Sequence, residues 1–299
     1  MNDMPIISVQ HVSKRFGSVQ ALDDISLDIH PGQIIGLMGS NGGGKSSLMR
    51  HWIGLYLPDS GKCTTFGVQA AKLGPEELAR IGYVHQEGEL IDWMSTAQLI
   101  RYVAAYYPNW NSDIENRYLK EFEVSKEARV GKLSPGQRQK LAILLAIGFQ
   151  PELLILDEPA AAMDPISRRK FLDLLLEMIQ VPGQTIVISS HILTDIEKVI
   201  DHAIIMDKGK LLCDCSLDDL REQYAKLRLT SLNGDIPEQL PFGTIIERKQ
   251  SGREAMLILS GNKKSREELE MLANSIHCHI EHQPLPLEEI YRLVMESQQ

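Results

Sequence analysis

Apolar residues recur along this chain both in short runs and in longer stretches of helical spacing. Near the N-terminus, residues 6–12 and 22–29 alternate apolar and polar positions, which predicts a pair of antiparallel strands. Other short apolar runs predict strands at residues 62–66, 78–84, 34–38, 153–156 and 184–188. Helical spacing predicts helices at residues 90–120, 141–149 and 166–179. We therefore expect an α/β fold.

The pattern changes near residue 220, where short runs separated by glycines begin. The pattern of this tail predicts strands at residues 227–232, 244–248 and 255–259. It predicts helices at residues 265–274 and 290–295. We therefore expect two domains, residues 1–219 and a small α+β accessory domain at residues 220–299. A histidine cluster in the tail leaves metal binding open, although on a strand His277 and His279 share a face from which Cys278 points away.

The composition favours an acidic protein of a reducing compartment. The 299 residues include 31 Lys and Arg against 40 Asp and Glu, a formal net charge of -9, so we expect no nucleic-acid partner. The four cysteines form no disulfide-like framework, and the N-terminus has no secretory signal. The longest apolar run, residues 141–149, is less than half of a membrane-spanning helix. We therefore expect a cytoplasmic location.

A glycine-rich loop follows the strand at residues 34–38 and precedes a predicted helix. It consists of Gly39, Ser40, Asn41, Gly42, Gly43, Gly44, Lys45, Ser46 and Ser47. The pattern G-x-x-x-x-G-K-[ST] binds phosphates, because glycines let backbone N–H groups surround them and the helix presents its positive N-terminus. Lys45 would reach the β- and γ-phosphates, and Ser46 would offer its hydroxyl to Mg²⁺. The alternative is a glycine-rich turn without chemistry.

Two acids, Asp157 and Glu158, end the aliphatic run at residues 153–156. Carboxylates at the C-terminal end of a parallel strand lie where α/β folds bind their ligands. Asp157 could hold Mg²⁺, and Glu158 could orient or polarise an attacking water. Gln86 and His191 also follow strands, so that Gln86 could reach a metal-bound water and His191 the same edge of the sheet. Each of these two is a weak signal alone.

Two further features have both a structural and a functional interpretation. Phe16 either stacks on an adenine or packs in the core. Ser134 suits a helix N-cap, Pro135 suits the first helical position, and Gln137 completes a capping box. A well-capped helix accounts for this segment. A second phosphate site, made of the Ser134 hydroxyl, the Gly136 N–H and the helix N-terminus, accounts for it as well.

In their order and spacing these motifs resemble those of the ATP-binding subunits of ABC transporters, over residues 6–219. Residues 39–47 match the Walker A loop, and residues 153–158 match Walker B with its catalytic glutamate. Gln86 matches the Q-loop, residues 133–137 match the signature, and residues 161–164 match the D-loop. His191 matches the switch histidine, and Phe16 matches the A-loop aromatic. Pro135 replaces the usual first signature glycine, which removes one N–H donor but no catalytic group.

The resemblance implies a P-loop NTPase core of ABC type, with an antiparallel β subdomain and an α-helical subdomain at about residues 90–150. It implies an ATPase that uses Mg²⁺. The catalytic residues would be Glu158, His191, Gln86 and Lys45, and the metal ligands Ser46, Gln86 and Asp157. Two such domains, in a homodimer or with a paired ABC subunit, would lie head to tail. Ser134 and Gly136 would serve the partner's γ-phosphate, and Gln137 and Asp164 would also be nucleotide-binding residues.

The resemblance further implies a separate transmembrane permease, which would hold the chain on the inner face of the cell membrane. The tail and spacing resemble bacterial drug, antibiotic and lantibiotic exporters. The aromatic-rich residues 87–107 are then a candidate docking surface for the permease, with packing in the core as an equal alternative. Three other functions stay open: an importer subunit, a non-transport ABC ATPase acting on ribosomes or DNA, and a non-catalytic regulatory homologue.

Overall fold

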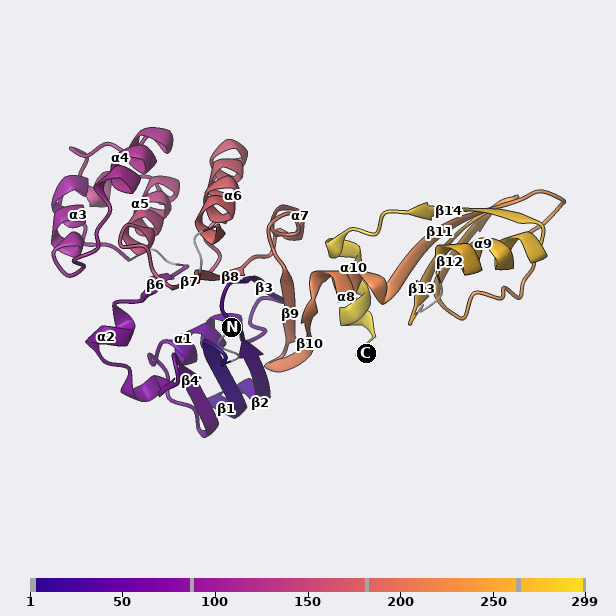
Figure 1. The fold of residues 1–299 in the computed structure, drawn as a ribbon, viewed down its shortest axis with the longest axis horizontal. Helices are drawn as coiled ribbons and strands as arrows, with labels where there is room; N and C mark the ends of the chain where they lie inside the picture. The colour runs from indigo at the N-terminus through magenta and orange to yellow at the C-terminus, as the bar shows by residue number, and fades with distance from the viewer. Residues whose placement is uncertain (1–3, 87–88, 181–182, 262–264, 298–299) are drawn as a thin grey trace. The chain divides into compact units, whose positions relative to one another are not determined.

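The computed structural model describes residues 4–86, 89–180, 183–261 and 265–297. The chain divides into two compact units, residues 1–214 and 215–299 (Figure 1). The boundary lies within strand β10 (Lys210–Ser216), five residues before the boundary expected from the sequence.

An antiparallel sheet opens the first unit. Its strands, in the order β2-β1-β4-β5, are β1 (Ile7–Phe16), β2 (Val19–Ile29), β4 (Ser60–Thr65) and β5 (Val68–Gln69). In β1 the buried side chains are Ile7, Val9 and Val12, with polar positions between them. The antiparallel pairing predicted near the N-terminus is confirmed, and both strands extend to the turn at Gly17, whose φ is 59°.

The second sheet of this unit carries the loops with chemical motifs. Its strands, in the order β10-β9-β3-β8-β7-β6, include β3 (Ile34–Gly39), β6 (Ile81–Val84), β7 (Leu153–Leu156), β8 (Thr185–Ser189) and β9 (His202–Asp207). Every residue of β7 and β8 is buried, as expected for strands covered on both faces. Because β6, β7, β8, β3 and β9 pair in parallel, their C-terminal ends meet at one edge.

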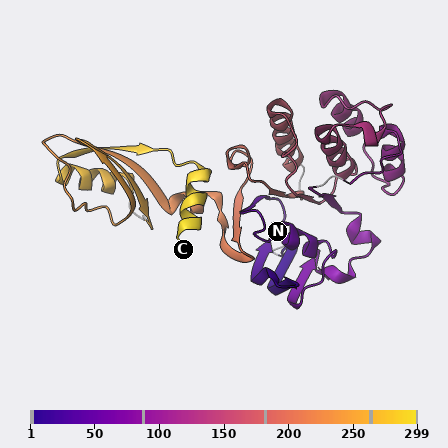
Figure 2. The ribbon, with the colours of Figure 1, turned by 180° about the vertical axis from the view of Figure 1, so that it is seen from behind.

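Some helices of the first unit pack against this sheet, and others form a group beside it (Figure 1). They are α1 (Lys45–Trp52), α2 (Pro75–Leu78), α3 (Thr96–Ala104), α4 (Ser112–Glu121), α5 (Pro135–Ile147), α6 (Pro165–Ile179) and α7 (Leu193–Ile196). Two 3₁₀ turns are η1 (Ala70–Lys72) and η2 (Val130–Lys132). Figure 2 shows α3, α4 and α5 grouped together, which matches the helical subdomain implied by the sequence.

The stretch predicted to be helical at residues 90–120 is helical only in α3 and α4, so this prediction was wrong at residues 90–95 and 105–111. Ser95 starts α3, since its hydroxyl accepts a hydrogen bond from the Gln98 N–H at 3.2 Å. Pro108 has no N–H and disfavours helix in the residue before it. Asn111 then caps α4 by accepting from the Ile114 N–H at 3.0 Å. Local capping therefore overrides the apolar spacing.

The second unit contains an antiparallel sheet with helices. Its strands, in the order β12-β13-β11-β14, are β11 (Tyr224–Ser231), β12 (Thr244–Ser251), β13 (Glu254–Ser260) and β14 (Cys278–Gln283). Its helices are α8 (Leu217–Glu222), α9 (Arg266–Ser275) and α10 (Leu287–Glu296). On β14, Cys278 is buried and His279 exposed, and the described residues hold no group of three or more His, Cys, Asp or Glu side chains that could bind a metal ion. Across the described ranges, no helix has the length and apolar character to cross a bilayer.

Candidate active site

The phosphate-binding pattern forms the loop between the end of β3 and the start of α1, and two of its glycines are required by close backbone contacts. Gly39 and Gly44 have φ values of 156° and 104°. A Cβ atom on Gly39 would lie 2.2 Å from the Met206 carbonyl oxygen, and one on Gly44 would lie 2.5 Å from the Ala21 carbonyl oxygen. Only glycine fits there, so β9 and β2 fix the path of the loop.

The ammonium group of Lys45 is hydrogen-bonded to the backbone of the phosphate loop. Its Nζ donates to the Gly39 carbonyl at 2.8 Å and to the Ser40 carbonyl at 3.0 Å. The residue is 7% exposed, and this burial lowers the pKa of its ammonium, while the nearby Glu158 and Asp157 carboxylates act in the opposite direction. The loop, the lysine and the two acids therefore share one electrostatic environment.

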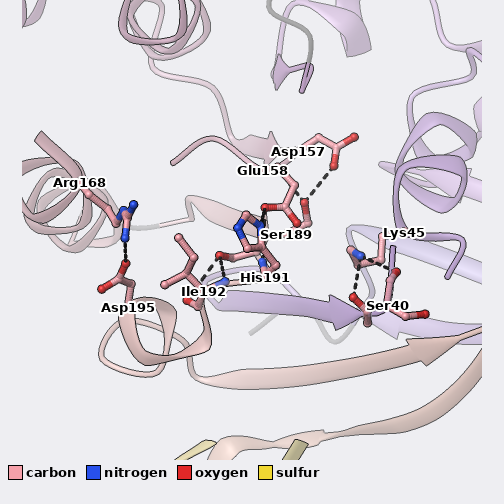
Figure 3. A network of polar contacts seen from close by, with 11 residues as sticks. Ser40, Lys45, Asp157, Glu158, Arg168, Ser189, His191, Ile192 and Asp195 are labelled. Atoms are coloured by element: carbon pink, nitrogen blue, oxygen red, sulfur yellow. Dashed lines mark hydrogen bonds and ion pairs between the residues drawn. The ribbon is translucent and has the colours of Figure 1, made fainter. Parts of the chain in front are cut away.

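Ser189, the last residue of β8, holds the two acids together (Figure 3). Its hydroxyl donates to Asp157 Oδ1 at 2.9 Å and accepts from the Glu158 N–H at 2.8 Å. Glu158 has a φ of 50°, a left-handed conformation that costs a non-glycine residue roughly 1 kcal/mol or more. The hydrogen bond from its N–H to Ser189 helps to hold Glu158 in this conformation.

His191 faces the Glu158 carboxylate (Figure 3). Nδ1 of His191 lies 2.7 Å from Glu158 Oε2, and because an ionised carboxylate only accepts, Nδ1 carries the proton. The Glu158 side chain is 9% exposed and the His191 side chain 56% exposed. The pair is therefore buried on its carboxylate side and open on its imidazole side.

One cavity of about 440 Å³ brings most of the predicted site residues together. The predicted residues that line it are Phe16, Asn41, Gly42, Gly43, Gly44, Lys45, Ser46, Ser47, Gln86, Asp157 and Glu158. Gly39 and Ser40 adjoin this set through Lys45, and His191 adjoins it through Glu158. Motifs separated by more than 100 residues thus meet at the edge predicted from the strand order.

The oxygen atoms at this edge fit a magnesium ion. Asp157 is 1% exposed, and its Oδ2 is buried without a hydrogen-bond partner among the described residues. An unpartnered buried carboxylate oxygen is unfavourable unless a cation or donor approaches it. Ser46 and Gln86 line the same cavity, and the hydroxyl and amide oxygens of such side chains suit Mg²⁺.

The residues that resemble the signature and D-loop lie apart from this cavity. At the start of α5, the Ser134 hydroxyl accepts from the Gln137 N–H at 3.3 Å, and the Gln137 side chain accepts from the Ser134 N–H at 3.0 Å. The predicted capping box is confirmed. A Cβ on Gly136 would lie 2.7 Å from the Ala162 carbonyl oxygen, so the two segments pack closely.

Asp164 caps the next helix, α6. It accepts hydrogen bonds from the Ser167 N–H at 2.9 Å and from the Ser167 hydroxyl at 2.6 Å, and these bonds lower the pKa of Asp164 to about 2. Lys140 Nζ lies 3.8 Å from its carboxylate. Among the described residues, Ser134, Gly136, Gln137 and Asp164 are not part of the lining of the cavity.

Two residues of this site were not predicted from the sequence. Ser189 bridges the acids, and Asp207 accepts from the Ser40 hydroxyl at 2.6 Å. Both stand at the C-terminal end of a strand of the central sheet. Their positions at the ends of two strands were the available signal, but their contacts depend on which strands are neighbours.

Comparisons with known proteins agree with this geometry. The family profile described as "ABC transporter" matches residues 22–161. The ABC transporter ATP-binding protein YtrB of Bacillus subtilis (strain 168) is 30% identical over 237 residues, 78% of this chain and 81% of YtrB. The bacitracin transport ATP-binding protein BcrA of Bacillus licheniformis is 32% identical over 233 residues, 76% of either chain. Relatives named for import match as well.

Solved structures share the fold. An ATP-binding subunit of an ABC transporter has a TM-score of 0.67 at 27% identity, covering 73% of this chain and 92% of that one. A dimeric ATP-binding cassette bound to ADP and phosphate has a TM-score of 0.63 at 24% identity, covering 71% and 98%. The fold class expected from the motifs is confirmed. The chain belongs to the family of ABC transporter ATP-binding proteins, and it is an ATPase.

Proposed function

We propose that this chain hydrolyses MgATP at the interface of a head-to-tail dimer and thereby drives a separate membrane permease. The proposal rests on one observation: at the edge of the central sheet, Lys45, Asp157 and Glu158 line one cavity with the phosphate loop. A buried lysine and glycine N–H groups suit a polyphosphate, and two acids beside them suit a metal and an attacking water.

The predicted residues that line the cavity have different roles in this proposal. The loop N–H groups and Lys45 bind the phosphates, and the ring of Phe16, 42% exposed at the same cavity, stacks on the adenine. Ser46, Asp157 and Gln86 hold Mg²⁺, which neutralises phosphate charge when bound. Glu158 accepts a hydrogen bond from the attacking water and orients it.

His191 supports this role of Glu158. Its Nδ1–H donates to the Glu158 carboxylate, which holds that carboxylate toward the cavity edge. The exposed side of the imidazole can contact a phosphate or a partner copy.

A second copy would complete the site. Ser134 and Asp164 are exposed, and Gly136 and Gln137 are half-buried, outside their own chain's cavity. The α5 N-terminus presents the Ser134 hydroxyl and backbone N–H groups, which suits an anion supplied from outside the chain. The dimeric cassette of similar fold supports a paired arrangement.

A groove beside the Q-loop is the candidate docking site for the permease. Its lining includes Tyr83, Leu90, Tyr107 and Phe149, and the last two rings stack with centroids 3.8 Å apart. In the candidate docking segment, Trp93, Tyr102 and Tyr106 are large exposed side chains, while Glu87 and Gly88 lie outside the described residues. Exposed aromatic side chains next to an apolar groove favour an interface. Through such a permease the chain would sit on the inner face of the cell membrane.

We propose export as the direction of transport, with a drug, peptide or other small molecule as cargo. Similarity to relatives named for Nod factor export supports the direction, and similarity to the bacitracin transport protein supports the cargo. An importer subunit is the alternative, supported by the relatives named for import. Both would use the same ATPase site.

The Glu158→Gln variant tests the hydrolytic role. The amide keeps the shape of the side chain but accepts protons poorly, so we expect steady-state ATP turnover to fall by about 100-fold or more. ATP affinity, measured by calorimetric titration, should stay within about twofold. Glu152→Gln, at the opposite end of β7, is the matched control and should keep parental turnover. Parental turnover in Glu158→Gln would refute the role of Glu158.

A further inference from the structure

Arg50, in the last turn of α1, contacts two different loops. It lies four residues after Ser46 and so on the same side of the helix. Its Nη1 donates to the Tyr56 hydroxyl at 2.8 Å, and its Nη2 donates to His85 Nε2. One guanidinium thus connects the phosphate-binding helix to the loop after α1 and to the loop after β6.

Tyr56 contacts both Arg50 and Phe16, the residue proposed to stack on adenine. The Tyr56 and Phe16 rings meet edge to face with centroids 5.2 Å apart. The Arg50 Cζ atom lies 5.4 Å from the centroid of the Tyr56 ring, and the Tyr56 N–H donates to the Arg50 carbonyl at 3.1 Å. Side chain and backbone therefore both hold Tyr56 against Arg50, and Tyr56 supports the face of the cavity that Phe16 lines.

His85 connects Arg50 to the part of the cavity that Gln86 lines. It directly precedes Gln86, whose side chain lines the cavity. A guanidinium only donates hydrogen bonds, so Nε2 of His85 is the acceptor of the bond from Arg50. The ring also contacts Tyr83 edge to face, with centroids 6.2 Å apart. Arg50 and Tyr83 thus restrain the chain just after β6 ends, one residue before Gln86.

We propose that Arg50 is a positioning residue that sets Gln86 relative to the phosphate loop through His85, and links that position to Phe16 through Tyr56. Ser46 and Arg50 belong to the same helix, so a shift of α1 moves both together. A guanidinium fork holds two partners in a fixed relative geometry, which a single ammonium or an apolar chain cannot do. The inference rests on the proposed role of Gln86 in holding the metal.

The competing explanation is that Arg50 only stabilises the C-terminus of α1, where a cation is favourable. The test compares Arg50→Met with Arg80→Met. Arg80 is a matched control, since it lies at the opposite end of β6, pairs with Glu152 and stacks on Phe66. Both substitutions remove a guanidinium and keep an unbranched apolar chain, so both report general destabilisation equally.

The first measurement is the gain in ATP affinity that Mg²⁺ provides, from calorimetric titrations with Mg²⁺ and with EDTA. We expect Arg50→Met to reduce this gain by about tenfold, as loss of a supporting hydrogen bond does at metal sites. Affinity in EDTA should stay within about twofold, and Arg80→Met should keep the parental gain. His85→Ala removes the acceptor without changing α1 and should reproduce the loss. An unchanged gain in Arg50→Met or in His85→Ala would overturn the inference.

The second measurement repeats Arg50→Met in a Gln86→Ala background. If Arg50 acts through Gln86, turnover falls about tenfold in the parental background and less than about twofold in Gln86→Ala. An equal fall in both backgrounds would overturn the inference while leaving the role of Gln86 intact. A Gln86→Ala variant with parental turnover and a parental Mg²⁺ gain would instead refute the proposed role of Gln86, and the inference with it.

Discussion

The phosphate loop and the start of α5 both place a helix N-terminus next to a serine, yet the two regions differ in their surroundings. Lys45 and Asp157 are buried at the loop and line a cavity with an aromatic ring and a glutamate. Ser134 at the start of α5 is exposed, and its contacts form a capping box. The phosphate loop is thus surrounded by buried charged groups, whereas the start of α5 faces outward.

Under the proposed function, this difference means that a single chain supplies one nearly complete half of a site and one outward-facing half. The groups proposed to bind phosphate, hold the metal and orient the water lie at one edge of the central sheet. The signature-like segment has the donors for an anion, but Ser134 does not line the cavity of the phosphate loop. Substitutions in the two regions should therefore separate binding by the single chain from turnover by a pair.

Lys45→Ala should have the largest effect. It removes the buried ammonium that faces the phosphates, so we expect ATP affinity and turnover each to fall by about 100-fold or more. Lys170→Ala is a matched control, because Lys170 Nζ also donates to a backbone carbonyl, that of Glu121 at 2.9 Å, but on α6. Calorimetric titration and a phosphate-release assay measure the two quantities. Parental ATP affinity in Lys45→Ala would show that the loop does not bind phosphate through this residue.

Ser134→Asp should separate binding from turnover. Aspartate caps a helix about as well as serine, so the free energy of unfolding should change by less than about 0.5 kcal/mol. Its negative charge would repel a partner's phosphate, and turnover should fall about 100-fold at unchanged ATP affinity of the single chain. Ser265→Asp is the control, since Ser265 forms the same capping box with Glu268 on α9. Equal turnover in both variants would count against the two-copy site.

Ser189→Ala should have an intermediate effect. Loss of its hydroxyl removes one partner from Asp157 and one from the left-handed Glu158, so turnover should fall by about tenfold. The free energy of unfolding, from chemical denaturation, should fall by about 1–3 kcal/mol. Ser190→Ala is the control, because the Ser190 hydroxyl contacts only the Ile192 backbone in the contacts of the described residues. A larger loss of turnover in Ser190→Ala would contradict the bridging role.

Phe16→Ala should have the smallest effect and should act on the base alone. Stacking of a base on an aromatic ring contributes about 1–3 kcal/mol, so ATP affinity should fall by at least about fivefold. Inhibition by inorganic tripolyphosphate, which has no base, should stay unchanged, and Phe16→Tyr should retain ATP affinity. Equal losses for ATP and tripolyphosphate would mean that Phe16 shapes the loop and does not stack on adenine.

The phosphate loop, the capping box and the buried strand before Asp157 could be predicted because each depends on neighbours in sequence. The glycines and Lys45 follow a local pattern, and Ser134, Pro135 and Gln137 define a helix start within four residues. The order of the motifs then predicted that they meet at one edge of a sheet.

Contacts between strands could not be predicted in the same way. Ser189 reaches Asp157 only because β8 lies beside β7, and Asp207 reaches Ser40 only because β9 lies beside β3. The break at residues 105–111 was missed for a different reason, since Pro108 and the Asn111 cap outweigh the apolar spacing around them. Arg50 stayed unnoticed because its partners lie in two loops.

The most direct test of the two-copy site is light scattering of the Glu158→Gln variant with and without MgATP. We expect a monomer without nucleotide and a dimer with MgATP, because bound nucleotide would join two copies and slow turnover would preserve the complex. Adding Ser134→Asp to this variant should leave a monomer that still binds ATP. A Glu158→Gln variant that stays monomeric with ATP bound, or a double variant that dimerises as readily, would contradict a site shared between two copies.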